Sequence, residues 1–234
     1  MLNTELLEQV KKYEWGRDRE VLTRVSDAVK QTYGNDAEAK AAEKQLLSVL
    51  ESQATYPGKQ FVCRQLRMIG TSQSVPILSG MLTDEETSDM ARYALESIPG
   101  SDVDAALRDA LPKAKGKPKI GIINSLGRRR DKQSVGALGE LVSDSDEMVA
   151  QAAVAALGKI ADEQAAKMLV QAKGQAKGKL QSLILDAYLS CADRLVAEGK
   201  KAQALAIYKE LQAQDLPKPI RSAALTGMIN AAKQ

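Results

Sequence analysis

The sequence predicts an all-α protein, a right-handed α–α superhelix (solenoid) of about 12–14 antiparallel helices. Hydrophobic residues make up 44% of the 234 residues but aromatic residues only 3%, and the apolar content includes 34 alanines. Alanine is the best helix former and lets helices approach closely. The β-branched and aromatic residues that strands favour are sparse and do not alternate. Apolar stripes at helical spacing recur about every 30 residues, which is typical of a solenoid.

Residues 143–174 form the clearest repeat, and they predict two successive helices. Ser-Asp-Ser at 143–145 offers N-cap candidates, and the acidic pair at 146–147 suits the positive end of a helix dipole. Gly158 is expected to stop the first helix, Asp162 to start the second and Gly174 to end it. The two apolar stripes comprise Val149, Ala152, Ala153, Ala156, Leu157, Ala165, Ala166, Leu169 and Val170.

The same pattern, a helix ending at a glycine and then a segment that begins with glutamine, occurs more than once. It is found at Gln60–Ile69 with Gly70 and Gln73–Leu78, at Gly121–Leu126 with Gly127 and Gln133–Leu138, and at Ala153–Leu157 with Gly158 and Gln164–Leu169. The three glutamines are 60 and 31 residues apart, so one degenerate unit, Asp84–Leu111, fills the longer interval. Four helix pairs are therefore expected, with second helices at about 74–82, 101–112, 131–142 and 162–173.

The segment Asp146–Asp162 contains Asp-x-x-Val and then Ala-Ala-Val-Ala-Ala-Leu-Gly-Lys-Ile-Ala-Asp, and it resembles the short HEAT repeats of bacterial proteins. Ile220-Arg221 followed by Ala224-Leu225 resembles the first helix of another such unit. HEAT repeats often carry arginine directly after the valine, whereas Ala150 occupies that position here and only Arg221 matches. The resemblance implies an armadillo-like solenoid that serves protein–protein interaction.

The regions on either side of these repeats are less regular. Residues 1–58 are expected to form three helices that pack on the stack, and Ser52–Gly58, which contains Pro57-Gly58, is expected to be a break. Residues 59–175 hold the four repeats. Residues 176–234 are expected to form a longer helix pair and a capping helix, together with the rest in one continuous domain. In this last part Gly199, Ala204, Tyr208 and Leu211, followed by Pro217, resemble the second half of a tetratricopeptide repeat.

The sequence offers little for catalysis. It has no histidine, which removes the commonest general base and metal ligand. It also has no Gly-rich nucleotide loop and no nucleophile elbow. The iron-dependent deoxyhypusine hydroxylases, which are HEAT-type enzymes, use His-Glu pairs that this chain cannot supply. We therefore expect a protein that is not an enzyme, with no cofactor and no metal.

The cysteines and the apolar runs bear on compartment and membrane. Cys63 and Cys191 are expected to be buried apolar residues rather than a disulfide or metal pair. No apolar run is long enough to span a bilayer, and the acidic, amphipathic N-terminus does not resemble a signal peptide. Two cysteines do not fix the compartment. A cytoplasmic location is the default expectation, and a secreted or periplasmic one would follow if a signal peptide had been removed.

Positive charge is concentrated in three turns, although the net charge of the chain is only +3. The candidate anion- or partner-binding residues are Lys113, Lys115, Lys117, Lys119, Arg128, Arg129, Arg130, Lys173, Lys177 and Lys179, with Lys132 beside the arginines. The two lysine turns lie one double repeat apart, so they are predicted to form a basic ridge on one edge of the solenoid and the arginines to lie on the other. These charges either aid solubility and offset the C-terminal ends of helices, or they bind an anionic partner.

Two functions follow as hypotheses. The first is a scaffold that binds a protein or peptide on a concave face lined by the second helices. The alternative is binding of nucleic acid or another polyanion through the lysine-rich turns. Because no aromatic residues are interleaved with the charges, such binding would rest on phosphate contacts and would depend steeply on salt. The oligomeric state and the identity of the partner do not follow from the sequence.

Overall fold

A computed structural model describes residues 2–174, 176–213 and 215–233. It contains fourteen α-helices and two short 3₁₀ turns, and the part of the chain described has no strand. The predicted all-α solenoid class is therefore confirmed. Contacts divide the chain into two compact units, one ending at Ile122 and the other beginning at Ile123. The three-part division of the chain stays a prediction, and its boundary at residue 175 lies outside the described residues.

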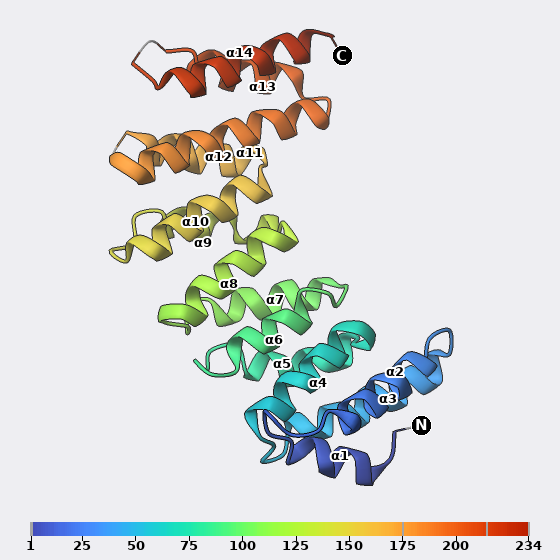
Figure 1. Cartoon of the computed structure of the whole chain (residues 1–234). Coiled ribbons are helices and arrows are strands. Elements are labelled where there is room, and N and C mark those ends of the chain that lie inside the picture. Colours follow the sequence, from blue (N-terminus) through green and yellow to red (C-terminus); the bar gives the residue numbers. More distant parts are fainter. Residues whose placement is uncertain (1, 175, 214, 234) are drawn as a thin grey trace. The chain divides into compact units, whose positions relative to one another are not determined.

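The first unit stacks short helices in two layers (Figure 1). Helix α4 packs on α6 in one layer and α5 packs on α7 in the other, while α1 packs against α2 and α3, and all three pack against α4. The helices are α1 (Thr4–Lys11), α2 (Glu20–Gln31), α3 (Asp36–Leu50), α4 (Tyr56–Ile69), α5 (Val75–Gly80), α6 (Ser88–Leu95) and α7 (Ser101–Ala110). Helix α8 (Gly116–Arg129) begins in this unit and ends in the second.

The second unit repeats this arrangement with longer helices. Helix α12 packs between α10 and α14 in one layer, and α9 packs on α11 in the other, with α13 against α12 and α14. The helices are α9 (Val135–Leu141), α10 (Glu147–Ile160), α11 (Glu163–Lys173), α12 (Gly178–Ala197), α13 (Lys201–Glu210) and α14 (Lys218–Lys233). The predicted helix pairs, the long helix after residue 180 and the final helix are all present.

The core follows the predicted stripes. In α10 the side chains of Ala153, Ala156 and Leu157 are fully buried, as are Ala165 and Leu169 in α11. In the C-terminal part, Ala204, Tyr208 and Leu211 are buried, and Tyr208 packs against Gly227 of α14. The predicted register of the central repeat is therefore confirmed.

Two glycines that were expected to end helices lie inside them instead. Helix α8 continues past Gly127 to Arg129, and α10 continues past Gly158 to Ile160. A Cβ on Gly127 would lie 2.7 Å from Ala156 Cα, and one on Gly158 would lie 2.9 Å from Ala187 Cβ. The absence of a side chain at these two positions allows the first helices of successive repeats to cross at backbone contact. The prediction that these glycines stop the helices is therefore wrong. Gly70 and Gly174 do follow the ends of their helices.

Two segments expected to be turns begin helices. Pro57 and Gly58 lie in the first turn of α4, after Thr55, whose hydroxyl accepts a hydrogen bond from Gly58 N at 3.2 Å. Residues 116–118, in the first lysine turn, are the first residues of α8. Proline is favourable at the start of a helix, because the N–H it lacks would have no partner there.

The helix caps match the expected residue types but not every expected position. Asp162 caps α11 by accepting a hydrogen bond from Ala165 N at 2.8 Å, as predicted. Helix α10 is capped by Asp146, which accepts from Met148 N at 2.9 Å, rather than by a residue of 143–145. An aspartate directly before the helix reaches the free amides of the first turn and also favours the helix dipole, so it serves both roles.

Candidate functional site

The first unit has a groove between α5 and α7, two of the predicted second helices. Its volume is about 560 Å³. Most of its lining side chains are small, so a ligand could approach the two helices closely. The lining residues are Pro76, Ser79, Gly80, Thr83, Asp102, Ala105, Ala106, Asp109, Ala110 and Lys113.

The groove carries two carboxylates, Asp102 and Asp109, two helical turns apart on α7. Asp102 lies in the first turn, where negative charge favours the helix dipole. Asp109 lies in the last turn, where a negative charge interacts unfavourably with the helix dipole. Its side chain is exposed and has no described hydrogen bond or ion pair. The placement of Asp109 therefore does not serve helix stability. Lys113, one of the predicted candidates, lies at the edge of this groove.

The two lysine turns share the motif Ala-Lys-Gly-Lys, at residues 114–117 and 176–179. In each, the glycine begins a helix with a left-handed backbone: φ is +52° at Gly116 before α8 and +58° at Gly178 before α12. Glycine adopts this conformation without the steric cost that a Cβ imposes. The same motif thus starts one helix in the first unit and another in the second.

Four of the candidate lysines lie at the start of a helix, where they do not offset a helix dipole. Lys117 and Lys119 are in the first turn of α8, Lys179 is in the first turn of α12, and Lys177 is its N-cap residue, without a side-chain capping bond. Positive charge is unfavourable at this end of a helix. The interpretation that the lysines compensate C-terminal helix ends is therefore wrong for these four.

The remaining candidates do lie near C-terminal helix ends. Lys173 is the last residue of α11, and Lys113 follows α7. Arg128 and Arg129 are in the last turn of α8, Arg130 follows it and Lys132 lies in the next 3₁₀ turn. The lysine turns belong to different units, so the basic ridge that would join them stays a prediction.

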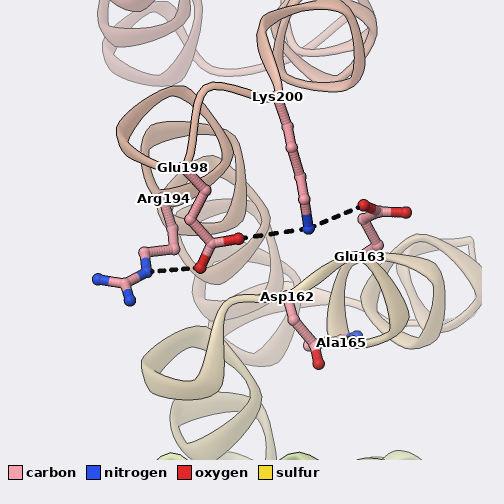
Figure 2. A network of polar contacts seen from close by, with 6 residues as sticks. All are labelled: Asp162, Glu163, Ala165, Arg194, Glu198 and Lys200. Carbon is pink, nitrogen blue, oxygen red and sulfur yellow. Dashed lines mark hydrogen bonds and ion pairs between the residues drawn. The ribbon is translucent and has the colours of Figure 1, made fainter.

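A network of charged side chains joins three segments of the second unit (Figure 2). Lys200 Nζ, before α13, lies 3.1 Å from a carboxylate oxygen of Glu163 at the start of α11 and 3.3 Å from one of Glu198. Arg194 Nε, in the last turn of α12, donates to the other oxygen of Glu198 at 3.1 Å. The hydrogen bonds to Glu163 and then Glu198 raise the pKa of Lys200, and those from Arg194 and Lys200 lower the pKa of Glu198. All these groups are solvent-accessible, so the network holds the segments together only modestly.

The two cysteine thiols are not suited to nucleophilic catalysis. Cys63 and Cys191 are buried and free, as predicted, and burial raises the pKa of each thiol to about 12, which makes them poor nucleophiles. Among residues 2–174, 176–213 and 215–233, no three side chains of the metal-binding types lie close enough together to hold an ion. Over the same residues, no helix is both long and apolar enough to cross a membrane.

The sequence patterns did not identify some of the charged residues that line the two grooves. Asp102 and Asp109 line the first-unit groove, while Lys159 and Arg194 lie near the arginine turn in the second unit. None of them belongs to a run of like charges, so no local cluster marks it. The repeat spacing gives one usable signal, because Gly127-Arg128 and Gly158-Lys159 are 31 residues apart and occupy equivalent places.

Solved structures that align over nearly the whole chain include an engineered protein, an enzyme and a designed repeat protein. An engineered protein from the Northeast Structural Genomics Consortium aligns over 99% of this chain and 72% of its own, at 18% identity and a TM-score of 0.46. Human deoxyhypusine hydroxylase in complex with glycerol aligns over 98% and 96%, at 14% identity and 0.41. A designed armadillo repeat protein in complex with the peptide (KR)4 aligns over 97% and 98%, at 15% identity and 0.34. At these scores the alignments carry no conclusion about function.

The sequence comparisons agree with the helix pairing described above. No curated protein matches the chain. The family described as HEAT repeats matches residues 105–180, from α7 to the start of α12. This segment includes Asp146–Asp162, on which the predicted resemblance mainly rests. The resemblance to HEAT repeats is therefore confirmed for residues 105–180.

Proposed function

We propose that this protein is a non-enzymatic scaffold that binds a peptide segment of a partner protein in the groove between α5 and α7. The observation that carries this proposal is the groove itself, about 560 Å³ in volume and lined mainly by small side chains. A groove formed by two packed helices is already in place before the partner arrives, so little ordering cost falls on this side of the complex.

The lining favours a peptide with an apolar and a basic residue. Ala105, Ala106 and Pro76 offer apolar surface, on which an apolar side chain would be shielded from water. Asp109 presents an exposed carboxylate that no described side chain pairs, at a helix end where it costs stability. A lysine or arginine of the peptide would pair with Asp109 and remove that cost.

The test is selection from a random peptide library against the whole protein and against Ala106→Phe. The half-buried Ala106 faces the groove, so phenylalanine fills it without entering the core. Selected peptides should be enriched in basic residues and lose about tenfold or more in affinity for the variant, because their space is occupied. Ala137→Phe, at an exposed position of α9, is the matched control and should bind as the unaltered protein does. No enrichment, or equal binding to Ala106→Phe, would contradict the proposal.

A second candidate function, polyanion binding through the lysine turns, is favoured by the position of the lysines. Lys117, Lys119, Lys177 and Lys179 stand at helix starts, where amide N–H groups and lysine ammonium groups attract an anion together. Because positive charge is unfavourable at the start of a helix, a binding role is the simplest reason for Lys117, Lys177 and Lys179. The partner class would be nucleic acid or an acidic polysaccharide, bound through its charges.

This second function is tested on a heparin column and with short DNA at two salt concentrations. Lys177→Asp should raise the stability of the fold by about 1 kcal/mol, because it adds the missing cap at an extended N-cap residue. If the lysines bind polyanions, the same variant should elute from heparin at lower salt although it is more stable. Lys167→Gln, on the exposed side of α11, should change elution less. Elution at the same salt for all three proteins would argue against this function.

A further inference from the structure

A second groove lies in the second unit, where the C-terminal parts of α8, α10 and α12 lie next to one another. Its volume is about 490 Å³, and it is distinct from the α5–α7 groove. It also lies away from Lys177 and Lys179, which are at the start of α12. The groove is lined by Gly127, Arg128, Arg130, Gly158, Lys159, Ala161, Ser190, Asp193 and Arg194.

Close helix crossings form the floor of this groove. Gly127 packs on the backbone of Ala156, and Gly158 packs on Ala187, so the three helices approach at backbone contact. The residues that follow each glycine, Arg128 and Lys159, are brought to the same groove from successive repeats. Two positive charges that are 31 residues apart in the sequence are therefore neighbours in this groove.

Arg130 occupies a backbone position at which glycine is the usual residue. Helix α8 ends in a Schellman motif, with Asp131 N donating to Leu126 O at 3.1 Å and Arg130 N donating to Gly127 O at 3.1 Å. The left-handed residue of this motif is Arg130, with a φ of +55°. A residue with a Cβ adopts this conformation at an energetic cost. Such departures from a local rule are concentrated at functional sites.

The charges that line the groove are strongly unequal. Arg128, Arg130, Lys159 and Arg194 face a single carboxylate, that of Asp193, which accepts a hydrogen bond from Tyr208 Oη at 2.6 Å. Arg194 is already paired with Glu198. Arg130 and Lys159 are exposed, and neither has an ion pair or side-chain hydrogen bond with residues 2–174, 176–213 or 215–233. These two cations can bind a ligand without first giving up a partner.

We propose that this groove binds an acidic peptide segment through carboxylates that pair with Arg130 and Lys159. Arginine binds a carboxylate through two parallel hydrogen bonds, and the lysine adds a second positive charge. The lining of the groove favours such a peptide over single-stranded nucleic acid. None of the lining residues is aromatic, so bases would find no stacking surface. The occupant differs in charge from the peptide proposed for the α5–α7 groove, and the two sites can succeed or fail separately.

The test measures fluorescence anisotropy of a labelled short peptide of alternating Asp and Ala, with an Asn and Ala peptide as the neutral probe. The binding variant is Arg130→Gly/Lys159→Gln. Glycine is favoured at the left-handed position, so the melting temperature of this variant should not fall below that of the unaltered protein. The matched control is Lys167→Gln/Lys209→Gln, which removes two charges from exposed positions of α11 and α13 in the same unit.

We expect the acidic peptide to bind the unaltered protein and the control, and its dissociation constant to rise roughly tenfold for the binding variant. The neutral peptide should bind neither. Equal weakening in the control variant would overturn the proposal, since the effect would then be general charge attraction. A short oligothymidylate that binds as tightly and is lost in the same variant would also overturn it, in favour of a phosphate-binding groove. Absence of acidic-peptide binding at low salt would overturn it outright.

Discussion

The two units share one way of packing but differ in surface charge. The residues up to Ile122 include 17 basic and 18 acidic side chains, whereas those from Ile123 include 16 basic and 12 acidic ones. The first unit has a groove with two carboxylates on α7, and the second has a groove with four cations at the ends of α8, α10 and α12. The repeat therefore fixes the spacing of the helices, and each unit places a different set of charges on that spacing.

The comparison also separates two kinds of residue within the repeat. Alanines and glycines at the helix crossings are buried or nearly in contact with the next helix, and they determine how closely the repeats stack. The charged residues beside them are exposed and vary from one unit to the other. Substitutions in the first group should change stability, and substitutions in the second group should change binding.

The largest expected effect on stability comes from a charge in the core of the second unit. Ala153→Asp places a carboxylate at a fully buried position of α10 and should lower the free energy of unfolding by several kcal/mol. Ala155→Asp, at an exposed position of the same helix, is the control and should change it little. Urea unfolding followed by circular dichroism measures both. Similar midpoints for the two variants would show that the buried face of α10 is wrongly assigned.

A smaller effect is expected where the helices of the second unit cross. Gly158→Val introduces a side chain against Ala187 and should cost about 1–3 kcal/mol through overpacking. Gly136→Ala, in α9, meets no atom within 4 Å and should be neutral or stabilising by about 0.5–1 kcal/mol. Thermal unfolding of both variants distinguishes a packing glycine from one without contacts. A neutral Gly158→Val would contradict the close crossing.

The smallest effect is a loss of stability at alkaline pH. Burial raises the pKa of Cys191 in the second unit and of Cys63 in the first from 9.0 to about 12. Above pH 9 the unfolded chain loses these protons while the folded chain keeps them, so stability falls as pH rises. The loss should be about 1 kcal/mol per thiol for each pH unit between 9 and 12. Burial and bonds to Glu210 and Asp193 also raise the pKa of Tyr188 and Tyr208.

Urea unfolding at pH 8, 9 and 10 measures this slope. Cys191→Ala should make the slope shallower, whatever its effect on stability at neutral pH. A slope that the substitution leaves unchanged would mean that Cys191 does not titrate differently in the folded and unfolded states.

The sequence predicted the helices and the buried faces well, because helical periodicity depends on local spacing. Ala153, Leu157, Ala165 and Leu169 could be assigned to the core from that spacing alone. The prediction from the sequence failed at glycine, because glycine can have either of two roles in these repeats. Gly158 could either end a helix or admit a close neighbour, and only the position of Ala187 decides between them.

The candidate sites were predictable only in part, because they too depend on contacts between residues that are distant in the sequence. Clusters of lysine and arginine are visible in the sequence. Whether such a cluster lies at the start or at the end of a helix depends on a helix boundary only two or three residues away. Contacts between distant residues leave no local signal. Glu43, for example, is fully buried and accepts a hydrogen bond from Thr71 N at 2.7 Å, 28 residues further along the chain.

The claim that the two units carry separate sites of opposite charge is tested most directly by nuclear magnetic resonance of the isotope-labelled whole protein. An Asp and Ala peptide should shift the amide signals of Arg130, Lys159 and their neighbours, and leave those of α5 and α7 unchanged. A Lys and Ala peptide should shift the signals around Asp109 and Ala106 instead. If both peptides shift the same amides, or neither shifts any, the two grooves are not separate binding sites.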